Sequence, residues 1–180
     1  MKYLILLFLT VMSSGVTYAI MPDDIINGKR NVILNDDDFN TFLIGVRDGD
    51  RKWLRTVPRV SEYIPSNKSN ELRDALSLSI IKSPSETINV LNEIDKVISD
   101  KGHSMPRDKF GSDSVCLTMI DINRYDRESF FKYYHLAESS LKRTGVKGKH
   151  CLDIMNSYVE EIKYEEKERK MKWGSEKYIY

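Results

Sequence analysis

The two cysteines of this 180-residue chain are the residues whose chemistry is easiest to define. Cys116 and Cys151 form an even pair, which favours a disulfide if the chain reaches an oxidising compartment. His150 precedes Cys151 and raises the alternative of a thiol nucleophile activated by a histidine. Neighbouring residues on a helix point about 100° apart, so these two side chains would diverge. We therefore expect a Cys116–Cys151 bond rather than a thiol enzyme.

The remaining groups that could do chemistry do not cluster in the sequence. His103, His135 and His150 each lack a second histidine or cysteine three or four residues away, of the kind that a helical metal site uses. The run Asp36-Asp37-Asp38 lacks the alternating spacing and the glycine of a calcium loop and is typical of a helix N-terminus. No HExxH, paired CxxC, glycine-rich phosphate loop or GxSxG motif occurs. The sequence predicts no catalytic residue, no metal site and no cofactor.

Residues 1–19 have the three-part pattern of a cleavable signal peptide. Lys2 supplies a positive charge, residues 4–12 are apolar, and Thr17 and Ala19 place small side chains before a cleavage site. The apolar stretch is about half of the roughly 20 residues that a membrane-spanning helix needs. We therefore expect a mature chain that begins at Ile20, is periplasmic or secreted, and does not insert into the membrane after cleavage.

The charge balance narrows the range of partners. Loss of Lys2 leaves 27 basic and 27 acidic residues, a net charge of zero. A nucleic-acid-binding protein normally carries a basic excess, and docking on anionic lipid requires a polybasic patch. Composition shows neither feature. Nucleic acid is therefore not expected as a partner, and docking on anionic lipid is disfavoured.

Apolar residues recur at helical spacing along most of the mature chain. The pattern predicts an all-α single domain over residues 20–162, with about six helices in antiparallel pairs and one disulfide. Asn35 or Asp36, Asp50 and Asp126 are the expected N-caps of three helices, and Ser83-Pro84 predicts another helix that begins at Pro84.

Three segments have weaker or different patterns. Residues 100–114 are polar, with two glycines and one proline, and predict an exposed loop. Residues 115–122 are apolar without a clear period and predict either a helical turn or a strand. Residues 163–180 predict a charged helical extension that projects into solvent, with an end that either frays or docks on a partner. Tyrosine and tryptophan favour contact surfaces. The candidate partner-binding residues are Tyr133, Tyr134, Trp173, Tyr178 and Tyr180.

The middle of the chain resembles a group of small exported bacterial proteins. The residues that carry the resemblance are Gly49-Asp50-x-x-Trp53-Leu54, Pro58, Ala75-Leu76-Ser77, Pro84, Val90-Leu91, Asp95 and the two cysteines, within residues 45–155. Short, exported, all-helical, disulfide-bonded chains of this kind resemble the periplasmic immunity proteins that block antibacterial toxins. The resemblance implies a protein partner.

Three hypotheses about function follow. The leading one is a non-enzymatic periplasmic protein that binds or inhibits another protein, such as a toxin. The second is a secreted hydrolase whose site is assembled from distant residues, which predicts a pocket with a strongly shifted acid or histidine. The third is an envelope accessory protein whose tail, residues 164–180, docks on a larger assembly.

Overall fold

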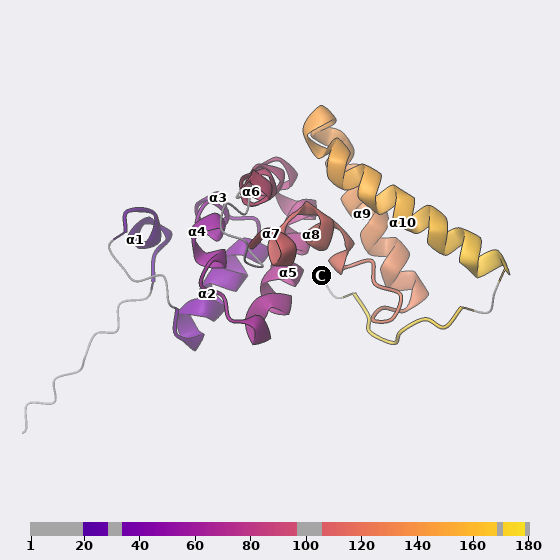
Figure 1. Ribbon diagram of the computed structural model, residues 1–180, viewed down its shortest axis with the longest axis horizontal. Coiled ribbons are helices and arrows are strands. Elements are labelled where there is room, and N and C mark those ends of the chain that lie inside the picture. Colours follow the sequence, from indigo (N-terminus) through magenta and orange to yellow (C-terminus); the bar gives the residue numbers. More distant parts are fainter. Residues whose placement is uncertain (1–19, 29–33, 97–105, 169–170, 179–180) are drawn as a thin grey trace, which may run out of the picture.

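The computed structural model describes residues 20–28, 34–96, 106–168 and 171–178, and the predicted signal peptide lies outside these ranges. The described residues confirm an all-α fold with one disulfide, and five of their helices have twelve or more residues (Figure 1). The elements are α1 (Pro22–Ile26), α2 (Asp36–Arg47), α3 (Arg51–Leu54), α4 (Val57–Ser61), η1 (Ser66–Lys68), α5 (Ser69–Lys82), α6 (Pro84–Lys96), α7 (Pro106–Phe110), α8 (Ser112–Thr118), α9 (Arg127–Arg143), η2 (Gly145–Gly148) and α10 (Lys149–Glu168).

The expected caps start three of these helices. The side-chain oxygen of Asn35 accepts a hydrogen bond from the N–H of Asp38, 2.8 Å away, at the start of α2. Asp50 accepts from the N–H of Lys52 at 2.8 Å and Asp126 from that of Ser129 at 2.7 Å. Each cap satisfies a backbone donor that the helix itself leaves unpaired. Pro84 is the first residue of α6, as predicted.

Helix α5 lies at the centre of the molecule and packs against α2, α6, α8 and α9 (Figure 1). It buries Leu72, Leu76 and Ile80. It also buries Ser77, whose hydroxyl donates to the carbonyl of Val115 at 2.6 Å, while the Ser77 carbonyl accepts from the Tyr133 hydroxyl at 2.8 Å. Buried polar groups need such partners. These bonds fix α8 and α9 against α5.

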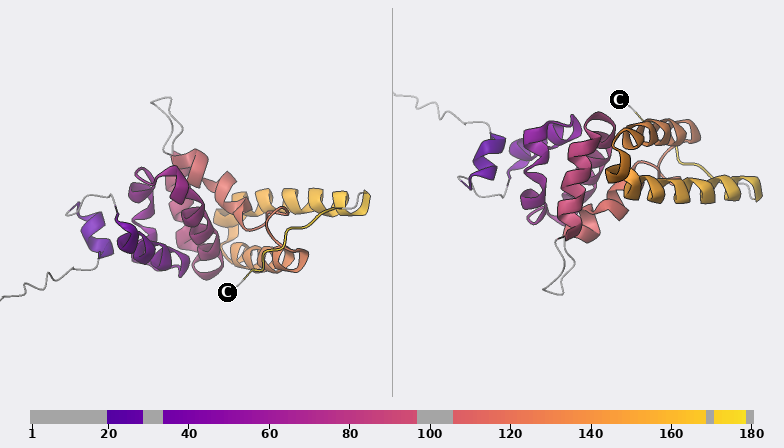
Figure 2. Two further views of the ribbon diagram at one scale, coloured as in Figure 1. Left: turned by 90° about the horizontal axis from the view of Figure 1, so that it is seen from below. Right: turned by 90° about the horizontal axis from the view of Figure 1, so that it is seen from above.

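Helices α9 and α10 lie side by side and extend away from the other helices (Figure 2). The predicted Cys116–Cys151 bond is present, with a Cα–Cα distance of 5.6 Å, and joins α8 to the first turn of α10. Both cysteines are buried. The disulfide therefore ties the base of the α9–α10 pair to the body of the protein.

Part of the segment that was expected to form a loop is helical. Residues 106–110 form α7 and residues 112–118 form α8, so the helical alternative for residues 115–118 is the correct one. Asp95 of α6 explains this difference, because its carboxylate accepts from the N–H of Ser112 at 3.0 Å and from the Ser112 hydroxyl at 2.7 Å. This cap comes from 17 residues away and leaves no local pattern. Residues 100–105 of the expected loop lie outside the described ranges.

The C-terminal extension also differs from the prediction. Helix α10 runs from Lys149 to Glu168, so the first part of the predicted extension, residues 163–168, continues the helix. Residues 171–178, which we call the strap, are not helical and run back along α9 (Figures 1 and 2). The strap donates from the Gly174 N–H to the Ile122 carbonyl at 2.8 Å and from the Glu176 N–H to the Arg124 carbonyl at 3.0 Å. These residues dock on their own chain instead of projecting into solvent.

Candidate functional site

The predicted partner-binding aromatics are placed in three different ways. Tyr133 has no exposed surface and Tyr134 is 7% exposed, so both belong to the core and neither offers a contact face. Trp173 and Tyr178 are half-buried in the strap. Their rings pack on α9, with Trp173 5.3 Å from Phe130 and Tyr178 5.6 Å from Tyr133 between ring centroids. Tyr180 lies outside the described residues. The amphipathic helix pattern could not reveal that the strap packs on Phe130 and Tyr133 of α9.

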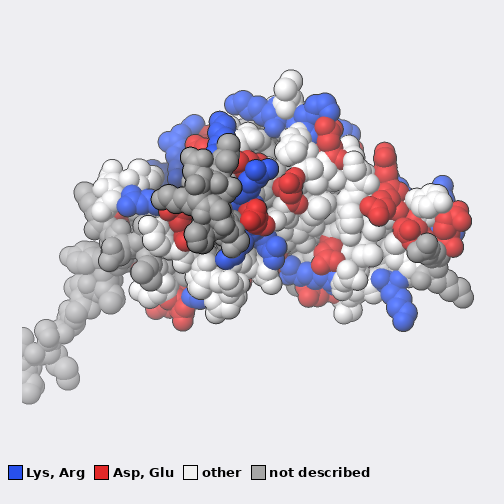
Figure 3. All heavy atoms as spheres, viewed as in Figure 1, with Lys and Arg blue, Asp and Glu red and all other residues white. Residues whose placement is uncertain are grey.

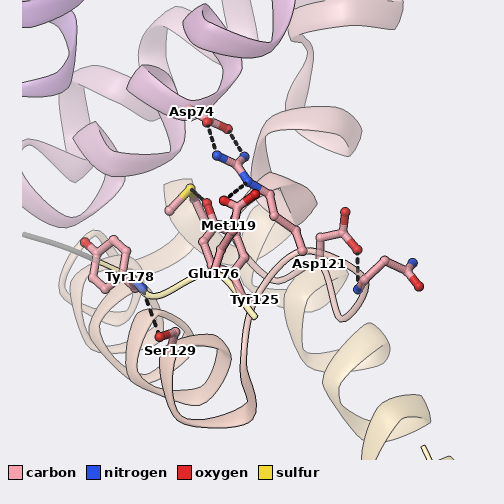
Figure 4. A network of polar contacts seen from close by, with 9 residues as sticks. Asp74, Met119, Asp121, Tyr125, Ser129, Glu176 and Tyr178 are labelled. Carbon is pink, nitrogen blue, oxygen red and sulfur yellow. Dashed lines mark hydrogen bonds and ion pairs between the residues drawn. The ribbon is translucent and has the colours of Figure 1, made fainter. Parts of the chain in front are cut away.

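A polar cluster that the sequence did not suggest lies beneath the strap. The guanidinium of Arg124 donates through both Nη atoms to the carboxylate of Asp74, at 2.8 and 2.7 Å, and through Nε to Glu176 at 2.8 Å (Figure 4). Its carbon also lies 4.9 Å from the centroid of the Tyr125 ring. The bond to Asp74 is the main reason that the pKa of Arg124 is raised. Such forked, charge-assisted bonds fix orientation as well as charge.

This cluster forms one wall of an open groove of about 410 Å³ between α5, α8 and the segment 120–124, which we call the Asp74 groove. Its floor includes Leu117, Ile120 and Tyr158, and its rim carries both signs of charge. Burial raises the pKa of the Tyr158 phenol, which keeps it protonated. The groove is lined by Asn70, Arg73, Asp74, Asp113, Ser114, Leu117, Thr118, Ile120, Asp121, Arg124 and Tyr158.

Arg73 projects from α5 at the edge of this groove. One of its terminal nitrogens donates to the side-chain oxygen of Asn70, but its Nε is buried without a hydrogen-bond partner. An unpaired buried donor costs free energy, about 1–3 kcal/mol. Solvent does not reach this Nε, so the groove does not expose it for hydrogen bonding to a ligand. Arg73 therefore contributes charge to the rim without forming a complete anion site.

A second depression, the α2–α5 groove, lies on the other side of Asp74 and encloses about 520 Å³. Leu43 and Ile44 of α2 and Leu78 of α5 give it an apolar lining. Ile44 is 51% exposed, so its side chain is open to solvent at this groove. Arg47 and Glu71 stand at the rim beside Asp74. An apolar centre with a charged rim is the usual anatomy of a protein-binding patch.

The described residues show little that is suited to acid–base or metal chemistry. No group of three or more His, Cys, Asp or Glu side chains within the described ranges could hold a metal ion. The described carboxyl groups with a shifted pKa, namely Asp36, Asp126, Glu138 and Glu166, all have it lowered by hydrogen bonds or cations. A general acid requires the opposite shift. None of the helices in the described ranges has the length and apolarity that crossing a membrane requires.

Comparison of the chain with protein-family models, with curated proteins and with solved structures gave no significant match. The structure itself describes the protein as an all-α chain with one disulfide, in which two neighbouring grooves meet at Asp74. Sequence spacing could not have revealed this meeting point, because Asp74 and Arg124 are 50 residues apart.

Proposed function

We propose that this chain is an exported, non-enzymatic protein that binds and inhibits another protein, in the manner of a periplasmic immunity protein. Two features support export to the periplasm or the medium. Residues 1–19 have the pattern of a signal peptide. The Cys116–Cys151 bond suits an oxidising compartment, where such bonds form and persist.

The observation that carries the proposal is the exposed Ile44 beside the α2–α5 groove. Binding energy at protein interfaces is concentrated in a few well-packed apolar contacts surrounded by a polar rim that excludes water. Ile44, Leu43 and Leu78 supply the apolar centre, and Arg47 and Glu71 supply a rim of both charges. The occupant is an apolar side chain of the partner protein, bordered on the partner by charges of both signs.

Inhibition by such a face is steric. The groove is formed by two long helices, one of which, α5, is held by contacts with α2, α6, α8 and α9. A preformed helical face loses little conformational freedom when it binds, so more of the contact energy appears as affinity. The bound partner is blocked because the body of this protein covers its working surface.

The two alternative functions have weaker support. A hydrolase needs a carboxyl group held protonated or a histidine tuned for proton transfer, whereas the shifted described carboxyl groups have lowered pKa values. A tail that docks on an envelope assembly needs free aromatic side chains, whereas Trp173 and Tyr178 pack on α9. Binding of a protein partner at the α2–α5 groove requires neither a tuned acid or histidine nor free aromatic side chains in the tail.

Partner capture with a matched pair of variants tests the proposal. The mature protein is used as bait for the purified products of the neighbouring genes, and binding is measured by calorimetry. Ile44→Asp should weaken the interaction at least tenfold, because it places a charge in the apolar centre. Val146→Asp is the control, since Val146 is 89% exposed and lies on η2, outside the residues that line this groove. Absence of any binding partner, or equal losses for both variants, would contradict the proposal.

A further inference from the structure

The turn between α9 and α10 carries a dense run of basic residues. Residues 142–150, which we call the basic turn, contain Lys142, Arg143, Lys147, Lys149 and His150 and no acidic residue. The overall charge balance conceals this cluster because acidic residues elsewhere cancel it. Figure 3 shows Lys and Arg side chains gathered along the upper edge of the molecule, where Figure 1 places this turn.

The helix dipole explains only two of the four Lys and Arg side chains of the basic turn. Lys142 and Arg143 lie in the last turn of α9, where positive charge meets the negative end of the helix dipole. Lys149 lies in the first turn of α10, which has no acidic residue, and there positive charge meets the positive end of the dipole. Lys149 also precedes its partner Asp153, which is the less favourable order for an i,i+4 pair. Lys149 is therefore placed where it opposes the stability of α10.

The tip of the basic turn is apolar and protrudes. Val146 is 89% exposed, the most exposed large hydrophobic residue among those described. The turn that presents it has a defined shape. Gly145 has φ +61°, a left-handed conformation typical of a helix C-terminus. Gly148 is buried where an added Cβ would overlap the Thr144 hydroxyl. The chain therefore holds Val146 away from the protein in a fixed position.

The cations of the turn are free to exchange their partners. Lys142 and Lys149 pair with Glu138 and Asp153 at 2.7 and 2.6 Å, but their side chains remain 60% and 68% exposed. Exposed ion pairs of this kind contribute little to stability, because water competes for both partners. His150 faces Asp113 of α8 at 3.8 Å. Within the described residues, no carboxylate contacts Lys147, and Arg143 contacts only Ser139 and Ser140.

We propose that the basic turn docks this protein on an anionic lipid surface, with Val146 entering the interface and the four flanking Lys and Arg side chains contacting lipid phosphates. A projecting apolar side chain forms no concave surface, so the basic turn is poorly suited to hold a ligand in a pocket. It suits a lipid interface, which accepts an apolar side chain while its charged headgroups attract the surrounding cations. In this mode the protein binds at the membrane surface, and no segment of it spans the membrane.

Vesicle co-sedimentation of the mature protein tests this proposal. Vesicles of phosphatidylcholine and phosphatidylglycerol (70:30) should bind the protein in dilute salt and release it at high salt, and pure phosphatidylcholine vesicles should bind much less. Lys147→Glu should weaken binding roughly tenfold, since it replaces a cation with an anion at an anionic surface. Val146→Asp should weaken it by a similar factor. Circular dichroism should show both variants fully folded, because both positions are exposed.

Lys163→Glu is the matched control, because it makes the same change in net charge at an exposed position near the other end of α10. It should reduce binding less than twofold. Equal losses for Lys147→Glu and Lys163→Glu would overturn the proposal, as would failure of the unmodified protein to bind in dilute salt. Displacement by inorganic phosphate at constant ionic strength would instead identify a site for the free ion and would also overturn docking on lipid.

Discussion

Arg124 and Glu176 join two segments that are 52 residues apart, with 2.8 Å between Nε of the arginine and Oε2 of the glutamate. The same guanidinium holds Asp74 through its two Nη atoms. Arg124 thus connects the strap, the segment before α9 and the central helix α5 (Figure 4). Both ion pairs share one cation but differ in exposure, since the side chain of Asp74 is 25% exposed and that of Glu176 is 57% exposed.

This difference predicts unequal effects of two conservative substitutions. Asp74→Asn should lower the free energy of unfolding by about 1–3 kcal/mol, because it leaves a partly buried guanidinium without its forked carboxylate. Glu176→Gln should lower it by less than about 1 kcal/mol, as expected for an exposed pair. Urea denaturation of the two variants and of the double variant measures both losses and their coupling. A larger loss for Glu176→Gln would contradict this account of the cluster.

Gly174 should be indispensable for the strap. An added Cβ would overlap the backbone carbonyl of Arg124, which cannot move without breaking the pairing of residues 122–126 with the strap. Gly174→Ala should therefore lower stability by about 1–3 kcal/mol and release Trp173 from Phe130. Limited proteolysis near residue 173 and a red shift in tryptophan fluorescence would report the release. Ser175→Ala, at an exposed position of the same segment, should change neither signal.

The disulfide should contribute strongly to stability. Cys116 and Cys151 close a loop of 35 residues, and restriction of the unfolded chain by such a loop is worth about 4 kcal/mol in the chain-entropy model. The Cys116→Ser/Cys151→Ser double variant should lose about this amount in urea denaturation. Reductant should act slowly on the folded protein, because both cysteines are buried. A double variant as stable as the unmodified protein would show that the loop constraint contributes little.

Acid should weaken α9 through its N-cap. Hydrogen bonds from Ser129 lower the pKa of Asp126 below its ordinary value. A lowered pKa means that the stabilisation is complete above the unfolded value, near 4, and is lost as the pH falls through the folded value. Asp126→Ala should therefore lower the melting temperature at pH 7 but have a smaller effect at pH 2. Asp126→Asn keeps a capping oxygen and should lower it less at pH 7. A difference that grows with acidity would contradict this assignment.

Export predicts a defined N-terminus. If residues 1–19 are removed, the N-terminal sequence of the secreted or periplasmic protein should begin at Ile20, and its mass should match residues 20–180. The side chain of Ile20 is buried in the core. Ala19→Arg places a large charge at the −1 position and should leave the leader attached. Recovery of the intact, uncleaved chain from the cytosol would contradict the signal peptide.

Local patterns were sufficient to predict much of this fold. The caps at Asn35, Asp50 and Asp126 depend only on neighbouring residues, so the local sequence is sufficient to predict them. The cap that Asp95 provides to Ser112 comes from another helix, and the expected loop was wrong there for that reason.

The candidate site was harder to predict than the fold. Tyr133 looks the same in sequence whether its ring meets solvent or lies against Ser77 and Tyr178, because a helical pattern defines a face without saying what covers it. The Asp74 cluster depends on contacts across 50 residues and more. The net charge of the chain sums the basic turn with all the carboxylates of the sequence and so concealed it.

The position of the strap in the sequence bears on the order in which the packing of α9 is completed. Synthesis proceeds from the N-terminus, so α9 and α10 are already made when residues 171–178 emerge. Until then Phe130 and Tyr133 lack the rings of Trp173 and Tyr178 that cover them. Until residues 171–178 have been made, this aromatic face of α9 therefore lacks part of its cover. The packing of α9 is thus completed by a segment that is synthesised after both α9 and α10.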